Sequence, residues 1–361
     1  MYKRQEHANV TIDILTGRDR GSKRNEKLQR LKTGELKILV GTHAVFQKDV
    51  EFFDLKLSIV DEQHRFGVNQ RLALGDKGIK VDVLVMTATP IPRSLELAQY
   101  GDMDVSVLDE KPPGRKPITT AAMPVERLVD VVSKLRSVIA DGCQVYWVCP
   151  LVEESEFMDL TAAEERFKYL RAALGDENVG LVHGQMSSVE KDSAMTSFVS
   201  GSTRVLVATT VIEVGVDVPN ATIMVIERAE NFGLAQLHQL RGRVGRGSDA
   251  STCILMYQSP LTKSAEQRLS ILRETEDGFK IAEEDLKMRG AGDIIGTAQS
   301  GLPNFRIGDL ESQGDLMMLA HKDARMLLEN DPELTSARGI AARHLLWLME
   351  QEKIIGLISV G

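Results

Sequence analysis

Short apolar runs that end in polar residues constrain the fold of this 361-residue chain more than any other feature. Three of them lie in the first part of the sequence, at 37–40 before Gly41, at 55–60 before Asp61 and Glu62, and at 81–86 before Thr87, Ala88 and Thr89. Each run is apolar enough to be buried on both faces, as parallel strands are, and functional residues gather at the carboxyl ends of such strands. The pattern predicts an α/β fold with parallel sheets and helices on both faces.

A proline-rich segment divides the chain. Residues 111–117 contain three prolines, and such a segment continues neither a helix nor a central strand. Five further apolar runs follow, at 145–149, 179–182, 204–208, 221–226 and 252–257, with helices expected at 162–174 and 189–199. We therefore expect the C-terminal part of one α/β domain at 1–112, a complete α/β domain at 118–258 and a mainly helical region at 259–361.

The helical region changes character along its length. It is rich in glycine from Gly290 to Gly301 and is expected to be helical again over 310–355. Trp347 is expected to pack in that last helical layer.

Composition excludes several classes of protein. The net charge is −8, from 44 Lys+Arg and 52 Asp+Glu, so the chain is not a wholly basic nucleic-acid binder. Aromatic residues make up only 5%, too few for an extended base-stacking platform. The three cysteines are scattered, which predicts buried thiols in a reducing cytoplasm without a disulfide framework or metal cluster. No apolar run is long enough to span a membrane.

The segment 18–37 departs from this acidic balance. It carries eight basic residues against the three acids Asp19, Glu26 and Glu35. Two interpretations are equally compatible with the sequence: the segment lines the path of a DNA duplex, or it is the solvated face of a helix.

Two constellations follow strands of the first part. Adjacent carboxylates at Asp61 and Glu62, before Gln63 and His64, could hold a hydrated Mg²⁺ and orient a water; the alternative is a solvated strand end. The small hydroxyl residues of the segment from Thr87 to Arg93, Thr89 included, could link two sites through hydrogen bonds, or could simply form a turn.

Two more constellations lie beyond the linker. Thr209, Thr210, Gly215 and Asp217 follow a strand and suit phosphate and ribose contacts, or form an N-capped helix. The segment from Gln239 to Gly247 then places three arginines within six residues. Guanidinium groups stabilise the charge of a transferring phosphoryl group, although a generic basic patch is the alternative.

The order and spacing of these four constellations resemble motifs II, III, V and VI of superfamily 2 helicases and translocases. Further segments are similar to the RecG family of branch-migrating DNA translocases, namely 41–44, 61–68, 87–93, 148–156, 239–247, 277–286 and 289–301. The last two resemble a translocation motif that this family shares with the transcription-repair coupling factor Mfd, whose motor is the alternative. Gln63 and the Cys149-Pro150-Leu151 segment favour the RecG family. The resemblance covers residues 14–340.

The resemblance implies a partial RecA-like domain, a complete RecA-like helicase C-terminal domain and a mainly helical C-terminal region. It also implies a set of roles. Asp61 would hold Mg²⁺, Glu62 would activate water, and Gln63 and His64 would couple the nucleotide to Thr87 and Thr89. ATP would also meet Gly215, Asp217 and Gln239, and Arg243 and Arg246 would reach its γ-phosphate. DNA would contact Gly41, Thr42, His43, Thr209, Thr210, Arg289 and Gln299.

One family motif is missing from the sequence. None of the 29 glycines is followed by lysine, so there is no Walker A loop to cradle the phosphates of ATP. We therefore expect a C-terminal portion of a longer protein that, by itself, hydrolyses ATP poorly or not at all. A non-catalytic DNA-binding remnant is a further alternative.

The expected cofactors are ATP and Mg²⁺, and the expected partners are forked and branched DNA. We also expect a monomer in the bacterial cytoplasm, associated with the nucleoid and not with a membrane.

Overall fold

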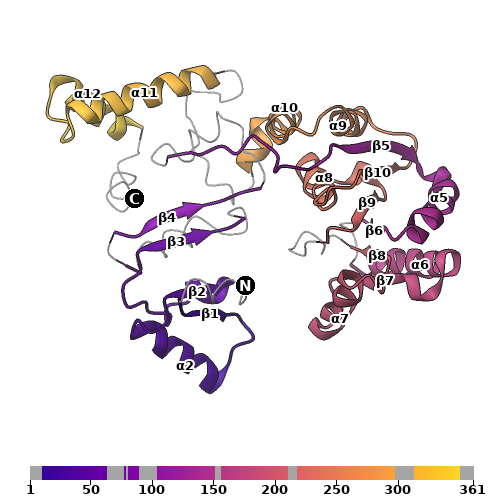
Figure 1. Cartoon of the computed structure of the whole chain (residues 1–361). Coiled ribbons are helices and arrows are strands. Elements are labelled where there is room, and N and C mark those ends of the chain that lie inside the picture. Colours follow the sequence, from indigo (N-terminus) through magenta and orange to yellow (C-terminus); the bar gives the residue numbers. More distant parts are fainter. Residues whose placement is uncertain are drawn as a thin grey trace. The chain divides into compact units, whose positions relative to one another are not determined.

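The computed structural model describes residues 10–62, 77–78, 80–88, 104–150, 156–209, 218–296 and 313–349; the side chains of 156–161, 289–296 and 314–315 lie outside this description. Helices and strands carry the labels of Figure 1. The chain divides into two compact units. Unit 1 comprises residues 1–88, 94–104 and 297–361, and unit 2 comprises residues 89–93 and 105–296.

Unit 2 is built on a six-stranded parallel sheet with the strand order β5-β10-β9-β6-β8-β7. Its strands are β5 (Ile118–Pro124), β6 (Gln144–Val148), β7 (Val179–Val182), β8 (Val205–Ala208), β9 (Ala221–Ile226) and β10 (Ser251–Tyr257). The parallel α/β class predicted from the apolar runs is confirmed. The sequence analysis missed β5, because this edge strand is only half-buried and its sequence is only weakly apolar.

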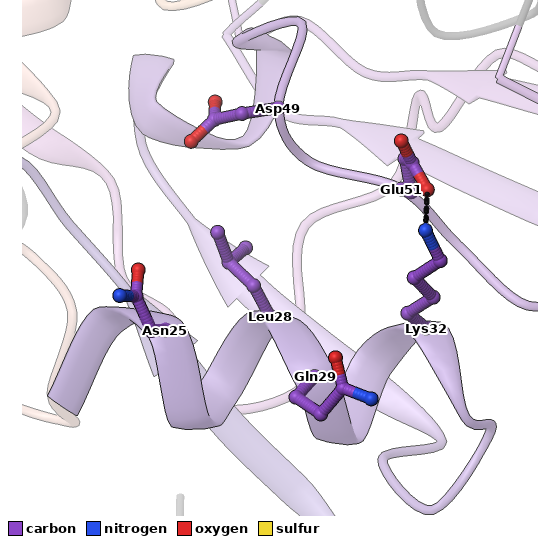
Figure 2. Close-up of a pocket in the computed structure, with 6 residues that line it drawn as sticks. All are labelled: Asn25, Leu28, Gln29, Lys32, Asp49 and Glu51. Atoms are coloured by element: carbon purple, nitrogen blue, oxygen red, sulfur yellow. Dashed lines mark ion pairs between the residues drawn. The ribbon is translucent and has the colours of Figure 1, made fainter. Parts of the chain in front are cut away.

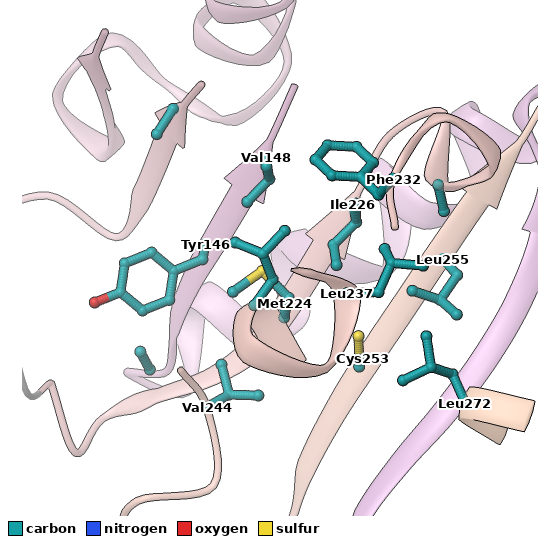
Figure 3. Packing of buried hydrophobic residues seen from close by; sticks show 14 of the residues in the cluster. Tyr146, Val148, Met224, Ile226, Phe232, Leu237, Val244, Cys253, Leu255 and Leu272 are labelled. Carbon is teal, nitrogen blue, oxygen red and sulfur yellow. The ribbon is translucent and has the colours of Figure 1, made fainter. Parts of the chain in front are cut away.

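Consecutive residues of the strands of unit 2 alternate between two hydrophobic cores. Tyr146 and Val148 enter one core (Figure 3), and Trp147 enters the other. The first core contains side chains of α7 (Ser188–Val199), α8 (Leu234–Arg241), α9 (Lys263–Glu274) and α10 (Gly278–Gly296). The second contains side chains of α5 (Leu128–Ala140) and α6 (Glu156–Leu174). Helices therefore cover both faces of the sheet, as predicted.

Unit 1 contains two separate pairs of parallel strands. β1 (Ile12–Leu15) pairs with β2 (Ile38–Gly41), and β3 (Leu57–Val60) pairs with β4 (Asp82–Val85). Helix α2 (Gly21–Lys32) connects β1 to β2. A small core lies beneath this helix, made of Leu15, Leu31, Leu36, Ala44 and Val50.

The expectation that the apolar runs at 37–40, 55–60 and 81–86, which form β2, β3 and β4, are buried on both faces is wrong. Leu57 and Ile59 of β3 are 53% and 57% exposed, and Leu84 of β4 is 48% exposed. Only alternate residues of β3, Ser58 and Val60, are buried. The physical reason is that, within the described residues, β3 and β4 form a separate two-stranded sheet, which leaves most of their side chains open to solvent.

Helices α11 (Gly314–Asn330) and α12 (Ala337–Leu348) form the C-terminal helical region. Asp331 shapes the turn between them by accepting hydrogen bonds from the backbone N–H groups of Thr335 and Ser336, each at 2.8 Å. The expectation that Trp347 packs is wrong: this side chain is 60% exposed, because the described elements leave its face of α12 uncovered. Across the described ranges, no helix has the length and apolar character needed to cross a bilayer.

Candidate functional site

Two of the predicted groups of functional residues, the acidic pair Asp61 and Glu62 and the segment that begins at Thr87, follow the carboxyl ends of β3 and β4. The strands run in register, Val60 beside Val85, and the backbone N–H of Met86 donates to the carbonyl of Val60 at 2.8 Å. Beyond them, the backbone N–H of Ala88 lies 3.5 Å from Glu62 Oε2. The acidic pair and the Thr87 segment therefore lie side by side at the carboxyl ends of these two strands, where parallel sheets commonly place functional residues.

The backbone itself orients the acidic pair. Asp61 accepts a hydrogen bond from the N–H of Glu62 at 2.9 Å through Oδ1. Glu62 has a φ of +53°, a conformation that is uncommon for residues other than glycine. This turn leaves Asp61 exposed beyond the strand, while Glu62 is half-buried and directed toward Ala88.

The segment after β2 is shaped by a glycine. A Cβ at Gly41 would lie 2.4 Å from the carbonyl oxygen of Leu15, so no larger residue fits beside β1. Thr42 then begins a 3₁₀ helix (His43–Phe46), and both Thr42 and His43 are exposed. This turn therefore presents a hydroxyl and an imidazole at the carboxyl end of β2, where the sequence analysis placed a DNA contact.

Ion pairs within the chain engage half of the basic residues of segment 18–37. Four of its eight basic residues form ion pairs with carboxylates of unit 1: Arg24 with Asp49 at 2.8 Å, Lys27 with Asp19 at 2.8 Å, Arg30 with Glu35 at 2.7 Å and Lys32 with Glu51 at 2.6 Å. The hydrogen bond from Lys27 lowers the pKa of Asp19 to about 2. These pairs favour the solvated-face interpretation for the four residues that they engage.

A cavity of about 260 Å³ lies beside α2. Figure 2 shows its lining, in which the ion pair between Lys32 and Glu51 stands at one side. Asn25, Leu28 and Gln29 of α2 and Asp49 of the facing loop complete it. The cavity contains none of the predicted site residues, so we do not include it in the candidate site.

In unit 2 the predicted residues follow β8 and α8. Thr209 is buried at the end of β8, and its backbone N–H donates to the carbonyl of Val182 at 3.3 Å. Gln239 lies half-buried on α8, two residues before the helix ends at Arg241.

The loop that follows α8, which we call the arginine loop (residues 242–247), has a fixed conformation. Val244 is buried, and Gly245 has a φ of +73°, which favours glycine. Arg243 and Arg246 are both partly exposed, and Arg246 Nε lies 3.4 Å from the carbonyl oxygen of Gly242. The loop thus carries two guanidinium groups on a backbone that buried Val244 anchors.

The third arginine of this motif has a different environment. Arg241 is only 2% exposed, and its guanidinium donates to the carbonyls of Leu272 at 2.7 Å and Thr275 at 2.9 Å. It also lies 3.0 Å from His238 Nδ1. Burial lowers the pKa of Arg241, and burial beside this cation lowers the pKa of His238 to about 4. Arg241 therefore joins α8 to the end of α9 and is not available to a ligand.

The sequence analysis missed a polar network at the carboxyl ends of β6 and β9. Glu227 directly follows β9 and is 9% exposed. It accepts hydrogen bonds from Trp147 Nε1 and from the guanidinium of Arg166, the latter at 3.0 Å through Oε2. Arg166 also stacks over Trp147 and Tyr169. An acidic residue directly after an apolar strand is the signal that singled out Asp61, and it could have found Glu227.

Several predicted site residues lie outside the described residues: Gln63, His64, Thr89, Thr210, Gly215, Asp217 and Gln299. Arg289 lies on the described helix α10, but its side chain is outside the description. The structure therefore places Asp61, Glu62 and Thr87 together in unit 1, and Gln239, Arg243 and Arg246 along α8 and the arginine loop in unit 2.

Three family models match the chain. Residues 2–98 match the DEAD/DEAH box helicase model, and residues 128–248 match the helicase conserved C-terminal domain. Residues 275–353 match domain 3, C-terminal, of the ATP-dependent DNA helicase RecG. The last match favours RecG over Mfd as the relative of the tail.

Individual proteins support the same assignment. The chain is 48% identical over 349 residues to the ATP-dependent DNA helicase RecG of Escherichia coli O127:H6 (strain E2348/69 / EPEC). This match covers 95% of this chain and 50% of that protein. It is also 48% identical over 327 residues to the protein of the same name from Bacillus subtilis (strain 168), and this match covers 90% of this chain and 48% of that protein. A solved structure of RecG bound to a three-way DNA junction matches with a TM-score of 0.66 and 42% identity, over 88% of this chain and 41% of that one. The chain thus spans about half the length of the curated relatives that it matches.

Proposed function

Because this chain belongs to the RecG family of superfamily 2 helicases, we propose that it serves ATP-driven translocation on forked and branched DNA, in recombination and repair. The observation that carries this proposal is the 48% identity to RecG relatives along 95% of the chain. A RecG structure bound to a three-way DNA junction supports branched DNA as the partner. We further propose a cytoplasmic, nucleoid-associated monomer with domains at 1–112, 118–258 and 259–361.

The acidic pair would perform the hydrolytic chemistry. The exposed carboxylate of Asp61 suits Mg²⁺, which proteins commonly bind through one or two carboxylates together with substrate phosphates. When bound, Mg²⁺ would screen the negative charge of the β- and γ-phosphates. Glu62 would accept a proton from the attacking water, and its contact with Ala88 would carry the state of the site to the Thr87 segment.

The second unit would supply positive charge and DNA contacts. Arg243 and Arg246 project from a loop whose backbone is fixed, so their guanidinium groups can meet the γ-phosphate with little loss of conformational entropy. Gln239 on α8 would bind the nucleotide beside them, with Gly215 and Asp217. DNA would contact Gly41, Thr42, His43, Thr209, Thr210, Arg289 and Gln299 through its phosphates, which fix position without reading sequence.

The test is ATP turnover with and without forked DNA. The 361-residue chain lacks a Walker A motif, so we expect little or no turnover from it alone. A chimera in which the N-terminal half of a RecG relative precedes this chain should hydrolyse ATP when forked DNA is added.

In that chimera, Glu62→Gln should lower turnover by roughly 10²–10⁴-fold and leave ATP binding intact, because it removes the general base but keeps the shape of the site. A chimera that binds forks but never hydrolyses ATP would support the non-catalytic remnant instead. Full turnover by the Glu62→Gln chimera would overturn the role of this residue.

A further inference from the structure

Two segments of unit 2 that are distant in sequence meet at Glu276. This residue lies between α9 and α10, and its side chain is 23% exposed. One of its oxygens, Oε1, accepts a hydrogen bond from the backbone N–H of Ile118 at 2.5 Å. The other, Oε2, pairs with the ammonium group of Lys111. Glu276 thus binds Lys111, the first residue of the proline-rich linker (residues 111–117), and Ile118, the residue that directly follows it.

The arginine loop contacts the same end of the linker. A Cβ placed on Gly245 would lie 2.9 Å from Cγ1 of Ile118, so the loop and the linker are in close van der Waals contact. Ile118 is also the first residue of β5, where it pairs with Ser251 of β10. The point at which the linker enters the sheet is therefore held by Glu276 from one side and by the arginine loop from another.

The segment that carries Glu276 is itself fixed. Arg241, one residue before the arginine loop, donates to the carbonyl of Thr275 at 2.9 Å. On the other side, Asp277 caps α10 by accepting from the backbone N–H of Phe279 at 2.9 Å through Oδ1. Glu276 is consequently anchored by α8 and α10, and a side chain with so little freedom can transmit a displacement.

We propose that Glu276 is a positioning residue that fastens the linker to the arginine loop, so that the linker and the two loop arginines move as one body. The functional part of this inference rests on the roles proposed above for Arg243 and Arg246. On the N-terminal side of unit 2, bending of the chain is then confined to residues before Lys111. A displacement of the residues before Lys111 is then transmitted to Arg243 and Arg246 through Glu276 and Ile118.

The geometry distinguishes this arrangement from an ordinary surface ion pair. Exposed ion pairs contribute little, because solvent screens them and two long side chains must be ordered. Here one partner is a backbone N–H at the edge of a sheet, and the carboxylate is mostly buried. Hydrogen bonds to charged groups of this kind are about twice as strong as neutral ones.

The first test uses the 361-residue chain and needs no activity. Hydrogen exchange of the Ile118 amide reports the contact directly. Glu276→Ala should speed this exchange about tenfold, because it removes a charged acceptor. Glu276→Gln should give a smaller increase, since the amide oxygen can still accept while the ion pair with Lys111 is lost.

The matched control is Glu274→Ala, which removes the same charge two residues earlier, at an exposed position that accepts a bond from Ser270 Oγ at 2.8 Å. It should leave exchange at Ile118 unchanged. Unchanged exchange in Glu276→Ala, or an equal increase in the control, overturns the contact. If Glu276→Ala does not fold, the comparison between Glu276→Gln and Glu274→Ala decides.

The second test addresses coupling in the chimera described above. Glu276→Ala should leave the KM for ATP unchanged and lower the number of base pairs unwound per ATP severalfold, and Glu276→Gln should retain part of the coupling. If Ile118 exchanges faster but unwinding per ATP is unchanged, the positioning role is wrong. If the unsubstituted chimera hydrolyses no ATP, the proposed function fails, and the exchange experiment still decides whether the contact exists.

Discussion

Units 1 and 2 begin from the same sequence pattern and reach different degrees of burial. In unit 2 an apolar strand such as β8 is buried throughout, because helices cover both faces of the six-stranded sheet. In unit 1 the apolar strands β3 and β4 form an isolated pair, and Leu57, Ile59 and Leu84 remain about half exposed. An apolar run therefore predicts a strand, while its burial depends on the elements that other parts of the chain supply.

The two units also differ in how they place charge. Unit 1 surrounds α2 with exposed ion pairs, which are individually weak. Unit 2 buries polar networks around Glu227 and Arg241, where each polar group needs a partner. Substitutions should accordingly cost more stability in unit 2 than in unit 1.

The largest difference is expected for one leucine-to-alanine change made in both units. Leu206 of β8 is fully buried, so Leu206→Ala should lower the free energy of unfolding by about 2–5 kcal/mol. Leu57→Ala, at a residue that is 53% exposed, should cost less than about 1 kcal/mol.

Urea unfolding measures both effects, followed by the fluorescence of buried Trp147 for unit 2 and by the amide NMR signals of β3 and β4 for unit 1. Substituting Trp347 with phenylalanine isolates the fluorescence of Trp147. Equal losses for the two leucines would contradict the comparison of the units.

Acid should destabilise the two units in different pH ranges. The pKa of His238 is about 4 in the folded state, against an ordinary value of 6.5. Between pH 6.5 and 4 the unfolded state therefore binds a proton that the folded state does not. Its contribution to stability is complete above pH 6.5 and falls by roughly 2–3 kcal/mol as pH drops toward 4. The pKa of Asp19 in unit 1 is about 2, so its contribution is lost only as pH falls from 3.8 toward 2.

The measurement is the free energy of unfolding at closely spaced pH values, with the fluorescence of Trp147 as the reporter for unit 2 and the amide NMR signals of β1 and β2 as the reporter for unit 1. His238→Gln should remove the decline of unit 2 between pH 6.5 and 4. A decline that persists in this variant would show that other groups cause it.

The smallest of these effects is expected for the buried arginine. Arg241→Ala should lower the free energy of unfolding of unit 2 by about 1–3 kcal/mol, because the carbonyls of Leu272 and Thr275 lose their donor. Arg273→Ala, at an exposed position on α9, is the matched control and should change it by less than about 0.5 kcal/mol. Thermal unfolding measures both, and similar losses would contradict the structural role of Arg241.

Much of the candidate site could be proposed from strand ends and motif order. Asp61 and Glu62 were singled out because carboxylates follow an apolar run, and the structure places them beside the Thr87 segment through the contact of Glu62 with Ala88. Glu227 carries the same signal, but nothing local reveals that Trp147 and Arg166 bind it. Such partners come from other elements, and sequence spacing does not encode their distance.

The sequence by itself determined most strands of the two units, the linker and the family, because periodicity, proline and motif spacing are local properties of the chain. Only the tertiary structure decided which face of β3 is buried, that Trp347 is exposed, and that one of three neighbouring arginines is structural. It also decided that the linker is fastened by Glu276, which lies 158 residues beyond Ile118 in the sequence. Burial and hydrogen bonding depend on what packs against a side chain, and that is settled only when distant segments meet.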